Sequence, residues 1–410
     1  MTEVFIVGVG TTLLGRFPAL SVKDLTAASV HAAIADSGGK LEDIQAAWFC
    51  NTRQGVMEGQ HGIRGQVALR PLGLGHIPIF NTDNACASST AGLNLARAYL
   101  KAGVCDVALV VGTEKMFFED KKAETFAAFK GSMDLELGEK HLQRIIDLTA
   151  DIPVPEGTAA GERSIFMDSY SALARYHMQK YGTTQRQLAA VASKSHWNSQ
   201  FNPNAQYRKL FSVDQILADK IISYPLTRPM CAPISDGSGA VILCSEAGLK
   251  KFDRNRAIRI LASQITTGVD HEKRTIEDAA GRVAATRAYE EAGLGPDALD
   301  VVELHDATAF GELKQIENMQ LCPIGDSGPF SESGNTALGG KIPINTSGGL
   351  LSKGHPIGAT GAIQIHEIVT QLRGEAGQRQ VEGARIGATE NGGGAYDGEE
   401  AIAAVTILGR

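Results

Sequence analysis

The sequence has no long apolar run. No segment approaches the roughly 18 consecutive apolar residues that a membrane-spanning helix needs, so we expect no membrane span. The N-terminal segment MTEVFIVGVG also lacks the basic stretch, apolar core and cleavage site of a secretory signal. These absences favour a cytoplasmic protein.

Positive charge is also scarce. The chain has 39 Lys and Arg against 46 Asp and Glu, a formal net charge of -7, so we expect no nucleic-acid partner. The cysteines form no C-x-x-C pair, and the sequence therefore predicts neither a metal site nor a disulfide framework. The cysteines are Cys50, Cys86, Cys105, Cys231, Cys244 and Cys322.

Short runs of Val, Ile and Leu alternate with longer segments of helical periodicity, which is typical of an α/β protein. We predict helices at Leu25–Asp36 and Thr286–Gly293, and two halves of similar plan at about 1–250 and 251–410. The expected strands are FIVGVG, DVALVVGTE and GAVILCS in the first half, and AIRILASQITT, VVELHDA and EAIAAVTIL in the second.

A more polar stretch between about 115 and 229 interrupts the first half. It contains the helical pattern SYSALARYHMQKYG and a turn at FNPNAQ, so we interpret it as an inserted cap. Such a segment either roofs a ligand site or decorates a subunit interface, and the sequence does not separate these alternatives.

Cys86 lies in NTDNACASSTAGLNLARAYLKAG, where small residues follow a strand and precede a helical pattern. A thiol at a helix N-terminus is expected to have a lowered pKa, and small neighbours allow a substrate carbonyl to approach it. This setting predicts a nucleophile that accepts an acyl group. The other interpretation is a buried cysteine that fills a gap between strand and helix.

Two histidines are candidate partners for this thiol. His305, in VVELHDATAFGEL, follows a predicted strand, and α/β proteins place their sites at the carboxyl ends of strands. His355, in NTSGGLLSKGHPIGATGA, lies in a glycine-rich turn where a ligand can approach closely. His355 could deprotonate a thiol, although either histidine could instead be a packed or solvated residue.

The segments NACASS, HDATAF and GHPIGATG together resemble the thiolase superfamily in order and spacing. The linking segments YSALARYHMQKYGTTQRQLAAVASKSHWNS and APISDGSGAVILCSEA are similar to the sterol-carrier-protein and archaeal acetoacetyl-CoA types. The resemblance extends over essentially the whole chain. It implies a thiolase fold of two duplicated βαβαβαββ halves in five α-β-α-β-α layers.

The resemblance also implies a homodimer or tetramer that acts on coenzyme A thioesters, without a tightly bound cofactor and possibly beside a small OB-fold partner. It implies an acyl-enzyme on Cys86, activation by His355, and an oxyanion hole that includes His305. A second hole would be formed by backbone N–H groups of Cys86 and Gly392. By the same resemblance, the expected substrate-binding positions are Ser347, Gly348 and Gly393.

The chain departs from the family at the second catalytic cysteine. The C-x-G-G-G segment of related enzymes is here ENGGG, with Glu390 first, and the H-D-C-F segment has Ala307. We expect Glu390 to replace this cysteine as a base, since the reference pKa of a glutamate is about 4.3. A solvent-facing or salt-bridged glutamate is the alternative.

The predicted function is acyl-CoA C-acyltransfer, by thiolysis of a 3-ketoacyl-CoA or by Claisen condensation. Two alternatives stay open: a lyase that performs retro-aldol or retro-Claisen cleavage, and a non-catalytic subunit that binds acyl-CoA or lipid. The sequence indicates neither the acyl chain nor the direction of the reaction.

Overall fold

The computed structural model describes residues 3–147, 149, 151–155, 164–269 and 278–410. In the first half, the strands β3-β2-β4-β7-β1 lie side by side, with β2 parallel to β3 and β4, and β7 antiparallel to β4 and β1. The strands are β1 (Val4–Thr11), β2 (Ala46–Cys50), β3 (Ile79–Thr82), β4 (Val107–Glu114) and β7 (Gly237–Ser245). Its helices outside the cap are α1 (Val22–Ser37), α2 (Gln54–Glu58), α3 (Arg64–Leu69) and α4 (Ser88–Lys101).

The second half repeats this plan in the order β9-β10-β11-β8, with the same parallel and antiparallel pairings. A bridge between Val302 and Ile344 takes the place that β3 has in the first half. The strands are β8 (Ile258–Thr267), β9 (Val301–Glu303), β10 (Ile386–Gly393) and β11 (Ile402–Gly409). The helices are α10 (Ala280–Ala292), α11 (Ala309–Asn318), α12 (Ser327–Glu332) and α13 (Thr360–Arg373).

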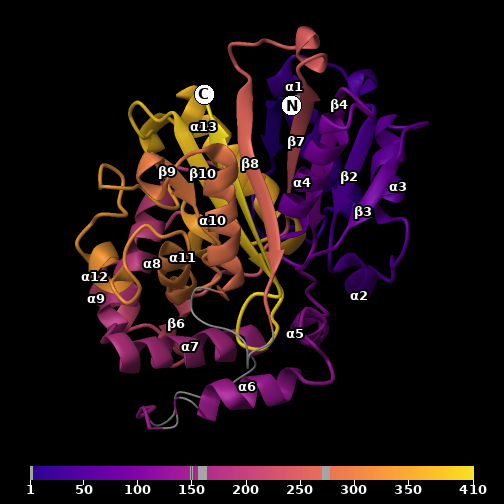
Figure 1. Cartoon of the computed structure of the whole chain (residues 1–410). Helices are drawn as coiled ribbons and strands as arrows, with labels where there is room; N and C mark the ends of the chain where they lie inside the picture. The colour runs from indigo at the N-terminus through magenta and orange to yellow at the C-terminus, as the bar shows by residue number, and fades with distance from the viewer. Residues whose placement is uncertain (1–2, 148, 150, 156–163, 270–277) are drawn as a thin grey trace.

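The two sets of strands join where β1 pairs with β8, which makes one sheet of nine strands (Figure 1). Helices α4 and α13 pack against each other and against strands of both halves, whereas α1 covers the first half and α10 the second. The strands of each half form one strand layer, with α4 and α13 between the two layers and α1 and α10 on the outside, so the order is helix, strand, helix, strand, helix. The duplicated five-layer arrangement expected from the sequence is confirmed.

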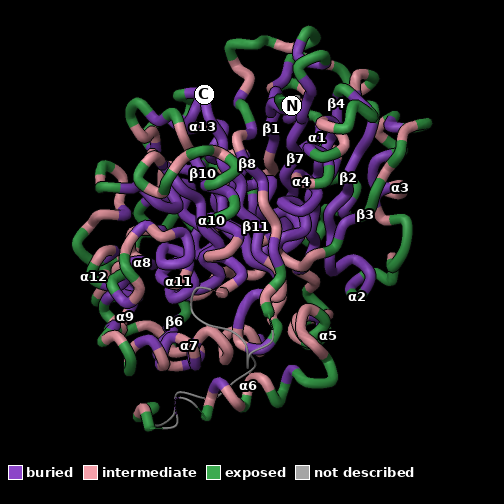
Figure 2. Tube along the Cα trace, in the orientation of Figure 1, coloured by how far each residue is buried: buried purple, intermediate pink, exposed green. Residues whose placement is uncertain are grey.

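The central layer explains the hydrophobic pattern of the chain. All residues of β4 and β7 are buried, as are twelve of the fourteen residues of α13 (Figure 2). Small residues let α4 and α13 cross closely, because a Cβ on Gly361 would lie 2.0 Å from Thr90 Oγ1. Since Cys86 and His355 precede these two helices, the close crossing brings them together.

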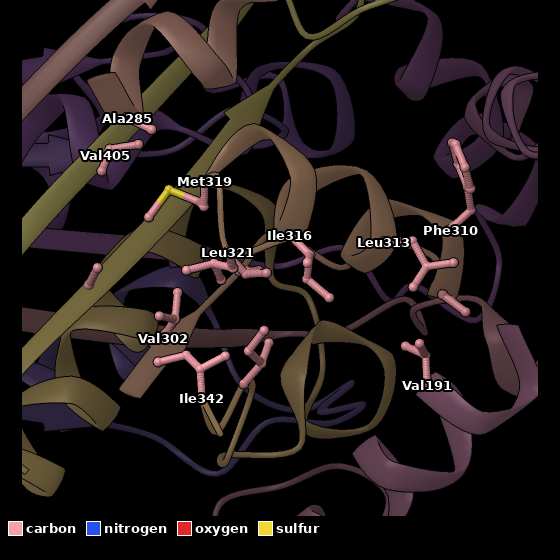
Figure 3. Close-up of a cluster of buried hydrophobic side chains, with 14 of the residues drawn as sticks. Val191, Ala285, Val302, Phe310, Leu313, Ile316, Met319, Leu321, Ile342 and Val405 are labelled. Carbon is pink, nitrogen blue, oxygen red and sulfur yellow. The ribbon is translucent and has the colours of Figure 1, made fainter. Parts of the chain in front are cut away.

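The second half is held together by a large apolar cluster (Figure 3). Phe310, Leu313 and Ile316 of α11 pack there with residues of α8, α10, β9 and β11. A buried leucine or isoleucine side chain contributes roughly 1.5–3 kcal/mol through the hydrophobic effect. This packing fixes α11, and with it the His305 loop that precedes the helix.

The segment 115–229 folds into helices and one small hairpin. Helices α5, α6 and α7 lie together at one end of the molecule (Figure 1). The helices are α5 (Lys122–Lys130), α6 (Gly138–Asp147), α7 (Ile165–Tyr181), α8 (Gln185–Ser199) and α9 (Val213–Leu217), and the hairpin joins β5 (Ile221–Ser223) to β6 (Leu226–Thr227).

The helices predicted at Leu25–Asp36 and Thr286–Gly293 are confirmed as parts of α1 and α10, and the six predicted strands overlap observed ones. The glycine-rich segment that begins at Glu390 lies partly in a strand, because Gly392 and Gly393 end β10. No helix in the described part of the chain is long and apolar enough to cross a membrane.

Candidate active site

The chain turns sharply at Cys86. Ala85 has a positive φ of 49°, and the Ser88 hydroxyl accepts a hydrogen bond from Asn84 N–H at 2.8 Å and donates one to Ala85 O at 2.6 Å. These contacts tie the loop to the first turn of α4. They hold the thiol at the floor of a cavity, just before the helix begins.

The thiol faces a histidine of defined tautomer. Cys86 Sγ lies 3.3 Å from His355 Nε2. His355 Nδ1 lies 2.8 Å from Thr360 Oγ1, and that hydroxyl donates its own hydrogen to Pro356 O at 3.3 Å. With its hydrogen on Pro356 O, the hydroxyl accepts a hydrogen bond from Nδ1–H, and in this arrangement Nε2 carries the lone pair that faces the thiol.

The surroundings favour the neutral forms of both groups. Burial raises the pKa of Cys86 to about 12, against the lowering effects of the Arg53 charge and of the backbone N–H groups of Cys86 and Gly394. Burial also lowers the pKa of His355 well below its usual range. The predicted thiolate of lowered pKa is therefore wrong for the resting state, because desolvation outweighs the helix N-terminus.

His305 completes the polar group at the cavity floor. It follows β9, is only 3 % exposed, and its ring centroid lies 5.3 Å from that of His355. Neither ring nitrogen of His305 has a hydrogen-bond partner among the described residues. Burial lowers the pKa of His305 to about 4, so a neutral imidazole with free donor and acceptor faces the cavity.

These three side chains could also hold a metal ion. The potential ligand atoms of Cys86, His305 and His355 all lie within 4.8 Å of one another. Such a set of sulfur and imidazole ligands suits Zn²⁺. Judging metal binding by C-x-x-C spacing missed this group, because its three residues come from distant segments.

Glu390 is placed differently from the expectation. Its Oε2 accepts the backbone N–H of His305 at 3.2 Å, its Oε1 has no hydrogen-bond partner in the described part of the chain, and the residue is fully buried. Burial and the nearby charge of Glu400 raise the pKa of Glu390 well above its usual range. Burial therefore acts against the carboxylate that we expected to be ionised at neutral pH. Glu390 holds the backbone of His305 through this hydrogen bond and does not line the cavity.

The glycines after Glu390 have separate functions. Gly394 lines the cavity with its N–H near Cys86 Sγ, whereas the expected Gly392 packs against Glu400, where a Cβ would lie 2.4 Å from the Glu400 Cγ. Gly393 approaches the nucleophile loop so closely that a Cβ would lie 2.3 Å from a backbone oxygen. The structure thus places Gly394, rather than Gly392, beside the sulfur, and Gly393 serves close packing.

Ser347 and Gly348, the other expected substrate-binding positions, do not line the cavity. Ser347 is buried and donates to Glu303 through both its N–H (3.1 Å) and its hydroxyl (2.6 Å), and Glu303 also pairs with Lys353 at 3.1 Å. A Cβ on Gly348 would lie 2.5 Å from the Ser199 Cβ. Both residues contact only buried protein groups, so we assign them to packing around the site and not to substrate binding.

The cavity holds about 1340 Å³ of empty space, including the part that is open to solvent. The cap forms one wall of it through side chains of α5 and α7. The aromatic and thioether residues in the lining are Met116, Phe126, Phe129, Phe166, Met167, Tyr170 and Tyr207. This wall suits a bulky apolar group, since ligand sites are mostly apolar with a few polar groups.

Sequence reasoning missed three residues around the nucleophile. Asn391 Nδ2 donates to Cys86 O at 3.0 Å and so fixes the loop, while Tyr170 and Arg53 line the cavity. Burial raises the pKa of Tyr170 well above its usual range, which keeps its phenol protonated. The only sequence signal for Arg53 is its place directly after a buried strand, in FCNTRQG.

Family models match both halves of the chain. The thiolase N-terminal domain matches residues 4–217, and the thiolase C-terminal domain-like family matches residues 262–410. The chain belongs to the thiolase family. The thiolase superfamily expected from NACASS, HDATAF and GHPIGATG is therefore confirmed.

Two relatives of this thiolase-family protein are similar over nearly all of the chain. Human sterol carrier protein 2 is 34 % identical over 403 residues, which cover 95 % of this chain and 70 % of the relative. Acetyl-CoA acetyltransferase of Methanothermobacter thermautotrophicus is also 34 % identical, over 96 % of this chain and 97 % of the relative.

Solved structures show the same fold at lower identity. The Ltp2-ChsH2(DUF35) aldolase superposes with a TM-score of 0.78 and 20 % identity, over 99 % of this chain and 97 % of that one. Human mitochondrial 3-ketoacyl-CoA thiolase superposes with a TM-score of 0.69 and 16 % identity, over 100 % of this chain and 98 % of that one. The fold of this thiolase-family protein is thus the fold of enzymes that differ in reaction.

Proposed function

We propose that this protein is an acyl-CoA C-acyltransferase that carries the acyl group on Cys86. The single observation that supports this most is the 3.3 Å contact between Cys86 Sγ and His355 Nε2. A neutral thiol beside a base of fixed tautomer is the arrangement that an activated cysteine nucleophile requires.

In the first half-reaction, His355 Nε2 takes the thiol proton as Cys86 Sγ attacks the thioester carbonyl carbon. The N–H groups of Cys86 and Gly394 lie beside the sulfur and would stabilise the oxyanion. The bond to the coenzyme A sulfur then breaks, and the departing thiolate takes the proton from His355. The acyl group stays on Cys86.

In the second half-reaction, a base removes an α-proton from a second thioester, and the enolate carbon attacks the acyl carbonyl to release Cys86. His305 is better placed than Glu390 for this proton transfer because its ring nitrogens are free and it lines the cavity. Glu390 positions His305 through the backbone hydrogen bond. Thiolysis of a 3-ketoacyl-CoA is the same path reversed.

The lyase function is the second candidate. The lack of a cysteine at position 307 or 390 favours it, together with the raised pKa of the buried Glu390. A lyase would cleave its substrate without exchange of labelled coenzyme A. A non-catalytic binding subunit would show neither cleavage nor exchange.

The remaining expectations belong to the same proposal. The protein would act on coenzyme A thioesters, without a tightly bound cofactor, as a cytoplasmic homodimer or tetramer. A small OB-fold partner agrees with the similar Ltp2-ChsH2(DUF35) aldolase, which includes a DUF35 chain. Light scattering of the purified protein, alone and with such a partner, would measure the oligomeric state and the association.

The proposal is tested by exchange of isotopically labelled coenzyme A into an unlabelled acyl-CoA, with no second substrate present. We expect exchange by the wild type and none by Cys86→Ala. The matched control is Cys231→Ala, since Cys231 lines the same cavity but has no histidine within hydrogen-bond distance. Exchange that persists in Cys86→Ala, or is lost equally in both variants, would contradict the proposal.

A further inference from the structure

Arg53 is a cation inside the cavity. It lies between β2 and α2, is 4 % exposed, and lines the same space as Cys86 and His355. Its charge acts on both of these groups. A ligand group that contacts Arg53 would therefore belong to the molecule that reaches the nucleophile.

The guanidinium of Arg53 is only partly satisfied. Its Nη1 donates to Ala128 O at 2.6 Å and its Nη2 donates to the Ser132 hydroxyl at 2.7 Å, while its Nε has no acceptor in the described part of the chain. The Phe129 ring lies 5.5 Å from its central carbon. An arginine has five N–H bonds, and because Nε itself is buried, the second N–H of each Nη is what is left for a ligand in the cavity.

Other buried cations of this protein have carboxylate partners. Lys353, Arg373 and Arg379 lie 3.1, 2.8 and 2.9 Å from Glu303, Asp36 and Glu367. Arg53 has no carboxylate within 4.0 Å among the described residues. Arg175, a second cation with no ion pair among the described residues, does not line the cavity.

Glu114 is the carboxyl whose charge acts on Arg53, but it does not bind the guanidinium. It accepts the backbone N–H of Arg53 at 2.8 Å and further donors from Thr52 and Gly358. Burial raises the pKa of Glu114, so this carboxyl offsets the charge only in part. A buried charge without a full partner is costly, which favours an anionic ligand beside Arg53.

We propose that Arg53 binds a free carboxylate on the acyl part of the substrate, so that the enzyme acts on coenzyme A thioesters of dicarboxylic acids. The guanidinium fork suits two parallel hydrogen bonds to a carboxylate. The aromatic side chains of α5 and α7 line the same cavity and accommodate an apolar or aromatic body. This inference rests on the proposed acyl-enzyme function.

A purely structural function of Arg53 is the competing explanation. Ala128 O is among the last carbonyls of α5, and a cation at a helix C-terminus is stabilising. That function would affect every substrate equally. Substrate selectivity therefore separates the two explanations.

The test compares two thioesters of similar shape. Glutaryl-CoA ends in a carboxylate, and 5-methylhexanoyl-CoA has an isopropyl group in its place. The rate at which each acylates the protein is followed by intact-protein mass spectrometry at limiting thioester concentration. We expect the wild type to prefer glutaryl-CoA by roughly 10- to 100-fold, as for hydrogen bonds to a charged group.

Arg53→Met should lose this preference: its acylation rate with glutaryl-CoA should fall by roughly 10- to 100-fold, while its rate with 5-methylhexanoyl-CoA should not change. Arg53→Lys should keep part of the preference. The matched control is Arg64→Met, since Arg64 begins the neighbouring helix α3, bonds to Asn51 at 3.1 Å and does not line the cavity. Melting temperatures of all variants check that they fold.

Three outcomes would contradict the inference: equal loading of both thioesters by the wild type, an equal loss for both in Arg53→Met, or the same change in Arg64→Met. Loading by neither thioester would instead contradict the proposed function. The loading of the two thioesters by the wild type is measured without any variant. The inference therefore stays testable even if Arg53→Met fails to fold.

Discussion

The hydroxyl of Thr360 is predicted to control the reactivity of Cys86 without touching it. Thr360→Val keeps the shape of the side chain and removes the oxygen that accepts from His355 Nδ1–H at 2.8 Å. Without this acceptor, the tautomer with a proton on Nε2 becomes accessible, and that tautomer cannot take the thiol proton. Thr360 is therefore a positioning residue.

The expected magnitude follows from the lost hydrogen bond. A buried donor without an acceptor costs about 1–3 kcal/mol, and each 1.36 kcal/mol is tenfold in rate. The acylation rate of Thr360→Val should thus fall by about 5- to 150-fold. The assay is stopped-flow mass spectrometry of the acyl-enzyme.

Thr360→Ser is the matched control, because it keeps the hydroxyl and should retain most of the rate. Acylation by Thr360→Val should also become more dependent on pH, since attack by the small thiolate fraction would then contribute. A Thr360→Val protein that is stable and acylates at the wild-type rate would refute the assignment of the tautomer.

Other measurements test the electrostatics of the site. Because burial lowers the pKa of His355, the acylation rate should stay constant between about pH 6.5 and 8.5 and fall only under more acidic conditions; a decline centred near pH 7 would contradict this. Micromolar Zn²⁺ should inhibit reversibly and protect Cys86 from alkylation, with EDTA restoring activity; inhibition unchanged in His305→Asn would exclude the three-ligand site. In the condensation assay, His305→Asn should reduce turnover by about 100-fold or more, and Glu390→Gln by less than tenfold; the reverse order would assign the α-proton to Glu390.

Periodicity predicted the α/β class and most of the buried strands, but not all of them. The strand at Ile386–Gly393 has three glycines among its eight residues, and its sequence therefore resembles a loop. These glycines are explained by tertiary contacts: a Cβ on Gly387 would lie 2.5 Å from the Ile368 Cγ2. Neighbours that are distant in sequence override the local preference.

The sequence predicted which residues meet at the site better than it predicted their charge. Cys86 and His355 are in contact as expected, because each residue precedes one of two tightly crossing helices. Their pKa values depend on how much protein surrounds them, which a motif does not record. The same holds for Glu390, whose pKa is raised by burial that the motif does not record.

Arg53 and Tyr170 were missed for a different reason. They belong to no catalytic motif: Arg53 lies between β2 and α2, Tyr170 lies in α7 of the cap, and the fold brings both to the same cavity. The wall of a cavity is a tertiary property, and the residues that determine substrate choice are therefore the least visible in the sequence.

The central claim is an acyl group on Cys86, and peptide mass spectrometry after incubation with acyl-CoA tests it most directly. The proposed mechanism predicts a mass increase on the peptide that contains Cys86 in the wild type and in Cys231→Ala, and none in Cys86→Ala. A protein that turns over its thioester substrate with no acyl group on Cys86, or with the group on another residue, would contradict it.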